Sequence, residues 1–159
     1  MAIQEGDKLP EATMYIMQEG RPTPVTTNDL FGGKKVVVFA VPGAYTPTCS
    51  QAHLPGFVVN ADAIKGKGVD SIVCISVNDA FVMDSWGADK NAEELLMVGD
   101  GNGEFTSAIG LEMDGSKFGL GERSQRYAMI VKDGTVSELL VEPGPGLNAS
   151  SAESVLAKL

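Results

Sequence analysis

Cysteine is scarce in this chain, whose 159 residues contain only Cys49 and Cys74. So small a number excludes the disulfide framework of a small secreted domain. Long apolar runs are also missing, and no segment approaches the ~18 apolar residues of a membrane helix. Residues 1–5 lack the basic and apolar regions of a signal peptide. We therefore expect a cytoplasmic protein that works in a reducing compartment and not in a membrane.

Positive charge is the second shortage. The chain has 12 lysine and arginine residues against 21 acidic ones, and its formal net charge is −9. This balance argues against nucleic acid or an anionic membrane as a partner. The length suits one domain with a real core, and no internal repeat or linker divides the chain. Residues 1–159 are therefore predicted to form a single domain.

Hydrophobic patterning predicts strands that alternate with helices. The near-continuous apolar runs 35–41 and 69–77 are typical of strands buried on both faces. Helical spacing covers 48–67, where Pro55-Gly56 should kink the helix, and also 79–90. Asp133-Gly134 stands between two further apolar runs and predicts a β-hairpin. The alternation favours a three-layer α/β/α domain with a central mixed β-sheet.

Shorter elements complete the predicted pattern. A weak strand at 12–17 is followed by the turn-rich segment 19–24. The helical turn at 27–32 has Thr27 as its expected N-cap, and Asn78 or Asp79 should open the helix at 79–90. The pattern Ser150-Ser-Ala-Glu153 predicts a capping box at the start of a last helix. A short strand at 95–98 and a short helix at 103–109 are also expected.

The stretch Pro42-Gly-Ala-Tyr-Thr46-Pro-Thr-Cys49 follows the apolar run 35–41 directly. It lies at the carboxyl end of a predicted strand, where sites gather in such sheets. Cys49 is either a buried core residue or a reactive thiolate. In the first turn of a helix, free N–H groups and the helix dipole favour the thiolate. Pro42 would shield the sulfur, and the Thr46 hydroxyl would donate to the thiolate and accept a substrate proton.

The stretch contains no cation to stabilise a thiolate. The strongest candidate is Arg126, which comes directly before the predicted strand at 127–132. An arginine there could stand beside the Cys49 helix and hold the thiolate with its fixed fork of donors. The alternative is a solvated arginine on the surface.

Pro42-x-x-x-Thr46-x-x-Cys49 resembles the P-x-x-x-T-x-x-C signature of the peroxiredoxins. The longer strings VPGAYTPTCSQAHLPGF, SVNDAFVMDSWG and RSQRYAMIVKDG are similar, in the same order, to the type II, peroxiredoxin-5-like subgroup. This resemblance implies a thioredoxin-like fold. It also implies reduction of hydrogen peroxide and organic hydroperoxides by a thiol, with no metal or other cofactor.

The resemblance also assigns roles to residues. It makes Cys49 the peroxidatic nucleophile, which becomes a sulfenic acid. Thr46 and Arg126 would hold the peroxide, Pro42 would shield it, and backbone N–H groups near Gly43 and Cys49 would complete the site. A homodimer formed through the loops around the site is implied as well. Its candidate contacts are Tyr45, Phe81 and Val82, which core packing explains equally well.

The thiol that reduces the sulfenic acid stays open. Some relatives carry a resolving cysteine in the region of residues 146–151, where this chain has none. Plant-type relatives have a second cysteine at the spacing of Cys74, which in this chain could equally be a buried structural thiol. Either Cys74 resolves after local unfolding, or glutathione, glutaredoxin or thioredoxin attacks the sulfenic acid directly.

Two other functions compete with this interpretation. His53 follows Cys49 by four residues, a spacing that would suit a Cys–His hydrolase. A base one turn along the same helix leaves little room for an acyl group, so a packed or surface histidine is favoured. The second alternative is a redox-sensing or scaffold protein that uses the same thiol without turnover.

Overall fold

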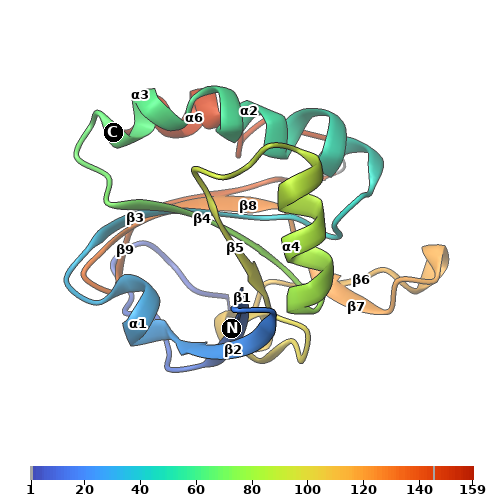
Figure 1. The fold of residues 1–159 in the computed structure, drawn as a ribbon. Helices are drawn as coiled ribbons and strands as arrows, with labels where there is room; N and C mark the ends of the chain where they lie inside the picture. The colour runs from blue at the N-terminus through green and yellow to red at the C-terminus, as the bar shows by residue number, and fades with distance from the viewer. Residues whose placement is uncertain (1, 145) are drawn as a thin grey trace.

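The computed structural model describes residues 2–144 and 146–159. Its centre is a seven-stranded sheet in the order β2-β1-β5-β4-β3-β8-β9 (Figure 1). β3 pairs in parallel with β4 and antiparallel with β8, so the sheet is mixed, as predicted. The strands are β1 (Thr13–Gln18), β2 (Arg21–Thr26), β3 (Lys35–Ala40), β4 (Ser71–Ser76), β5 (Leu96–Gly99), β8 (Tyr127–Lys132) and β9 (Thr135–Val141).

Helices cover both faces of this sheet. Helices α2, α3 and α6 lie over one face in Figure 1, and α1 lies under the other. The helices are α1 (Thr27–Phe31), α2 (Leu54–Val59), α3 (Ala61–Lys65), α4 (Ala80–Asp89), α5 (Glu104–Ile109) and α6 (Ala152–Leu156), with a π-helix η1 (Cys49–His53) before α2. No helix among the described residues is long and apolar enough to cross a membrane.

Two apolar cores lie on the two sides of the sheet. In β3, Val37 and Phe39 belong to the core under α2, α3, α4 and α6, whereas Val36 and Val38 belong to the core with α1 and α5. All four side chains are fully buried. The three-layer arrangement and the strand buried on both faces are therefore confirmed.

The edge strand β2 was not expected, because residues 19–24 have the composition of a turn. β2 pairs with β1 and places Pro22 opposite Met17 and Pro24 opposite Tyr15. Prolines two residues apart face the same side of a strand, so at a sheet edge both missing N–H groups can face outward. A second, two-stranded ladder, β6 (Glu112–Asp114) with β7 (Glu122–Ser124), was also not predicted.

The predicted hairpin is confirmed, whereas two of the predicted N-caps are wrong by one residue. Asp133 and Gly134 join β8 to β9 with φ angles of 47° and 78°. The cap of α1 is Thr26, in a capping box with Asp29, because the Thr27 hydroxyl bonds to the backbone of residues 10 and 12 instead.

The last helix shows the same displacement of its cap. Ser151 caps α6, because the Ser150 hydroxyl donates to Glu142. Asp79 caps α4, as predicted. Where two neighbouring residues can both serve as caps, a distant partner that engages one of them decides between them.

The irregularity expected at Pro55-Gly56 takes the form of a π-turn. In a regular α-helix the Pro55 ring would clash with the carbonyl of Gln51, four residues earlier. The structure instead has a wider turn over Cys49–His53, in which the Leu54 N–H donates to the Cys49 carbonyl. The proline therefore determines the shape of the helical turn that carries Cys49.

Gly99 allows the end of β5 to pack against the chain that enters α4. A Cβ atom there would lie 2.8 Å from Asn78 O, Asp79 C and Ala80 N. We expect Gly99→Ala to lower the free energy of unfolding by about 1–3 kcal/mol, since backbone atoms cannot move aside cheaply. The measurement is urea denaturation. Gly101→Ala is the control, because its nearest contact would be an ordinary 3.4 Å, and an equal loss in both variants would contradict this account.

Candidate active site

Cys49 lies where the sequence predicted, in the first turn of the helix that follows β3. The helix begins at Pro47, and the Ser50 N–H donates to the Thr46 carbonyl at 2.9 Å. The thiol is free, and its residue is 0% exposed. The start of the helix directs unpaired N–H groups and the positive end of the dipole toward this region, which favours a thiolate.

Arg126 is the cation at this sulfur. Its Nη2 donates to Cys49 Sγ at 3.0 Å, and its Nη1 donates to His53 Nδ1 at 2.9 Å. The side chain is half-buried. It comes from the start of β8, which lies beside β3 in the sheet. The alternative of a solvated surface arginine is therefore wrong.

The Thr46 hydroxyl makes a different contact from the one expected. It donates to the Gly43 carbonyl at 2.7 Å and not to the thiolate. A hydroxyl has one proton to donate, so in this arrangement Thr46 is left with lone pairs that can accept from a substrate. Of its two expected capacities, the geometry supports the acceptor.

Arg123 is a site residue that the sequence analysis missed. Its Nη1 donates to the Pro42 carbonyl at 3.2 Å, and its Nε donates to the Leu120 carbonyl at 3.0 Å. A Cβ atom on Gly43 would lie 2.9 Å from Arg123 Nη1. Pro42-Gly43 is therefore held by a second arginine, which packs closely against Gly43. Arg123 is the first residue of the string RSQRYAMIVKDG, and nothing in its neighbours gave a local signal of this contact.

Helix α4 holds the active-site stretch at two points. Tyr45 OH lies 2.8 Å from Ser85 Oγ, and the Trp86 indole N–H donates to Ser50 Oγ at 2.9 Å. Tyr45 has a φ of 67°, a left-handed conformation that is costly for an aromatic residue. The two contacts with α4 hold the residue before the Thr46–Cys49 segment, Tyr45, and the residue after it, Ser50. They thereby maintain the left-handed conformation of Tyr45.

His53 is a packed residue, as favoured, and it has two polar partners. Its ring lies 5.0 Å from Phe39 and 5.6 Å from Phe57, and its Nε2 lies 2.8 Å from the Ser150 carbonyl oxygen. Burial lowers the pKa of His53 to about 4, and the positive charge of Arg126 acts in the same direction. The imidazole is therefore neutral at pH 7.

Glu142 organises the loop that carries the Ser150 carbonyl. Its carboxylate accepts hydrogen bonds from the N–H groups of Asn148, Ala149 and Ser150 and from the Ser150 hydroxyl, at 2.7 to 2.9 Å. Burial raises the pKa of Glu142, but these hydrogen bonds outweigh it and bring the pKa below its usual value. The Glu142 N–H donates to the Arg126 carbonyl. The loop is therefore linked to Arg126 in two ways, through this backbone hydrogen bond and through His53.

Cys74 lies inside the sheet. It is in β4, between Phe39 of β3 and Met97 of β5, and is fully buried. Burial raises its pKa well above the usual value, and the neighbouring charge of Cys49 adds to this effect. At neutral pH Cys74 is therefore a thiol, the weakly nucleophilic form.

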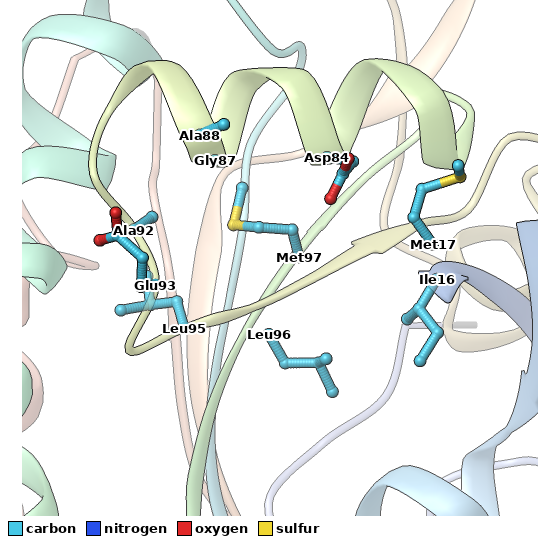
Figure 2. Close-up of a pocket in the computed structure, with 10 residues that line it drawn as sticks. All are labelled: Ile16, Met17, Asp84, Gly87, Ala88, Ala92, Glu93, Leu95, Leu96 and Met97. Atoms are coloured by element: carbon cyan, nitrogen blue, oxygen red, sulfur yellow. The ribbon is translucent and has the colours of Figure 1, made fainter. Parts of the chain in front are cut away.

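A cavity of about 550 Å³ opens beside the site and is lined by Pro42, Thr48 and Arg126. Met113 and Phe118 supply apolar walls. Figure 2 shows a different cavity, of about 260 Å³, between α4, β1 and β5. Its ten lining residues include no cysteine, histidine or arginine. Thiol chemistry therefore belongs to the first cavity.

No group of three or more histidine, cysteine or acidic residues in 2–144 and 146–159 has the arrangement of a metal site. The site consists of a buried thiol at a helix start, a guanidinium in contact with it and a cavity above it. On a sheet of this topology, these features define a thiol-dependent oxidoreductase with a thioredoxin-like fold.

Comparison with known proteins gives the family. The profile of the Redoxin family matches residues 4–156. The chain is 48% identical over 163 residues to Peroxiredoxin-2E, chloroplastic, of Arabidopsis thaliana, covering 99% of this chain and 70% of that protein. It is 43% identical to Peroxiredoxin-2D of the same plant, covering 99% and 98% of the two chains. The chain belongs to the peroxiredoxins, in their type II, peroxiredoxin-5-like group, and is a thiol-dependent peroxidase.

Solved structures agree with this family. The reduced Prx3 of Vibrio vulnificus in complex with hydrogen peroxide superimposes with a TM-score of 0.95 at 54% identity, covering 98% of each chain. Peroxiredoxin 5 of Alvinella pompejana gives 0.85 at 34% identity, covering 98% and 96%. The expected thioredoxin-like fold is confirmed.

Loss of the arginine fork is expected to slow the reaction with peroxide strongly. Arg126→Ala should lower the second-order rate constant for peroxide by about 10²-fold, the effect of removing one preorganised donor. Stopped-flow kinetics measures it. Arg21→Ala, which removes an exposed arginine on β2, should react like wild type. Equal rates in the two variants would show that the contact with Cys49 has no part in catalysis.

Acid is expected to destabilise the fold through His53. Its folded pKa of about 4 lies below the ordinary 6.5, so unfolded chains take up the proton first, and stability falls as pH drops from 6.5 toward 4. Arg126 and Glu142 lie at the same end of the β8–β9 pair, and both charges act on the ring. The lowered pKa of Glu142 also makes stability fall with pH, because the folded carboxylate resists protonation more than the unfolded one.

Between pH 6.5 and 4, protonation of His53 is expected to lower the free energy of unfolding by about 3 kcal/mol. It is measured by urea unfolding at pH 7 and at pH values down to about 4. His53→Gln, which has no proton to gain, should lose less stability on acidification. Parallel losses in the two proteins would contradict the assignment.

Proposed function

We propose that Cys49 is the peroxidatic nucleophile of this peroxidase. Its thiolate attacks one oxygen of the hydroperoxide, so that an S–O bond forms while the O–O bond breaks. The leaving hydroxide or alkoxide takes a proton and departs as water or an alcohol, and the product is a sulfenic acid. The observation that carries this proposal is the 3.0 Å contact between Arg126 Nη2 and Cys49 Sγ.

The surrounding residues take the roles that their geometry allows. Arg126 stabilises the thiolate and the charge that develops on the leaving oxygen. Thr46 accepts a hydrogen bond from the peroxide, while Pro42 and Gly43 form the wall held by Arg123. Organic hydroperoxides place their apolar part in the adjacent cavity.

An external thiol reduces the sulfenic acid in our proposal. Glutathione, glutaredoxin or thioredoxin forms a mixed disulfide with Cys49 and releases water, and a second thiol then frees Cys49. Support comes from Cys74, which is a protonated thiol in the middle of the sheet. A disulfide would require Cα atoms within about 7 Å and converging side chains, and so the withdrawal of Cys74 from both neighbouring strands.

A homodimer is the assembly that the exposed residues favour. Tyr45 is 49% exposed and Phe81 is 59% exposed, so core packing does not explain either side chain, while Val82 is half-buried. Tyr45 belongs to the active-site stretch itself, and Phe81 belongs to α4, which holds that stretch. The cytoplasmic location and the organisation of residues 1–159 as one domain stay predictions from the sequence.

A matched pair of cysteine variants tests the proposal. Cys49→Ser should abolish peroxide consumption, because a serine hydroxyl is not ionised at neutral pH. Cys74→Ser should keep most of its steady-state rate with glutathione and glutaredoxin, measured at a peroxide excess over protein. Continued turnover under these conditions also excludes a sensor, which would stop after one equivalent.

The opposite results are equally clear. Activity of Cys49→Ser above a few per cent of wild type would reject Cys49 as the nucleophile. Failure of Cys74→Ser with every reductant, together with an internal disulfide in the mass of oxidised wild type, would make Cys74 the resolving cysteine.

A further inference from the structure

The guanidinium of Arg126 has two contacts that cannot be set independently. Nη2 donates to Cys49 Sγ and Nη1 to His53 Nδ1. A guanidinium is planar and rigid, so a partner that holds one terminal nitrogen also fixes the direction in which the other points. The acceptor atom of His53 therefore determines the angle at which Arg126 meets the sulfur.

His53 can accept from Arg126 only in one protonation state, and the structure selects it. Its other nitrogen, Nε2, lies 2.8 Å from the Ser150 carbonyl oxygen, which can only accept. Nε2 therefore carries the proton, and Nδ1 presents its lone pair to Arg126. The Ser150 carbonyl is itself held in place, because the N–H and hydroxyl of Ser150 both donate to Glu142.

The two partners of Arg126 lie on the same side of the π-turn. Cys49 and His53 are the first and last residues of η1. Residues four apart lie on nearly the same side of a regular α-helix, and the same holds in a wider turn with i→i+5 hydrogen bonds. The sulfur and the imidazole can then face one guanidinium together.

We propose that His53 is a positioning residue for Arg126, and that the Ser150 carbonyl, held by Glu142, keeps its imidazole in the tautomer that accepts. The role rests on the proposed function of Cys49. Because His53 is neutral, it orients the guanidinium without neutralising its charge, which stays available to the sulfur. His53 is 1% exposed and contacts Arg126, not the peroxide site directly.

The tautomer can be observed in the unmodified protein. His53 is the only histidine of the chain, so ¹⁵N chemical shifts of labelled imidazole report this ring alone. At pH 7 we expect a proton on Nε2 and none on Nδ1. An Nδ1-protonated or doubly protonated ring would overturn the proposal, because Nη1 of Arg126 would then have no acceptor on His53.

Variants test the positioning role through the thiolate. His53→Leu keeps an apolar side chain but has no acceptor, and we expect a lower thiolate fraction at pH 7 and a peroxide rate reduced about tenfold or more. His53→Gln offers an amide oxygen to Arg126 and an N–H to Ser150. This variant should therefore keep most of the wild-type thiolate fraction and most of the peroxide rate. Phe57→Leu is the matched control, since it removes packing from the same aromatic group and no polar contact.

The readouts are ultraviolet absorbance of the thiolate, stopped-flow rates and melting temperatures. Equal thiolate fractions in His53→Leu and Phe57→Leu, or no recovery in folded His53→Gln, would overturn the proposal. The absorbance needs no peroxide, so it tests His53 even if the wild-type protein were inactive, and inactivity would reject the proposed function alone. If His53→Leu does not fold, the tautomer and the His53→Gln measurements decide.

Discussion

A buried sulfur, which in our proposal reacts as a thiolate, is the constraint on which this structure depends. Cys49 is fully buried, so water cannot stabilise its thiolate, and an uncompensated charge there would be costly. The protein supplies the start of a helix and the Arg126 fork instead. Arg126 is at the start of β8, between β3, which leads to Cys49, and β9, which leads to Glu142. The sheet order therefore brings together all segments that this charge requires.

The helix that carries Cys49 is irregular for a local reason with a distant consequence. Pro55 cannot continue a regular helix from Gln51, and the π-turn before it accommodates the ring. The same turn directs Cys49 and His53 to one guanidinium. On the other side of the sulfur, Tyr45 keeps a costly backbone conformation because α4 holds it. Rigidity at the site thus comes from a proline within the helix and from hydrogen bonds between elements.

Predictions held where one cause decides the local structure. The strand at 35–41 is apolar on both faces, and Asp-Gly turns a hairpin by its own backbone preferences. They were wrong where two causes compete. Segment 19–24 has turn residues but becomes β2, since a sheet edge tolerates the missing N–H groups of its prolines. Thr26 and not Thr27 caps α1, because the Thr27 hydroxyl donates to the Pro10 carbonyl instead.

The sequence by itself determined the family, through the Pro42–Cys49 motif, and the place of Cys49 in the first turn of a helix. Only the tertiary structure decided which contacts serve that sulfur: Arg126 with its fork, His53 as acceptor and Arg123 behind Pro42. The residues in these contacts are far apart in the sequence: Cys49 and Arg126 are separated by 77 residues, and His53 and Ser150 by 97. Local patterns record the propensities of neighbouring residues, whereas such pairs depend on the order of strands in the sheet.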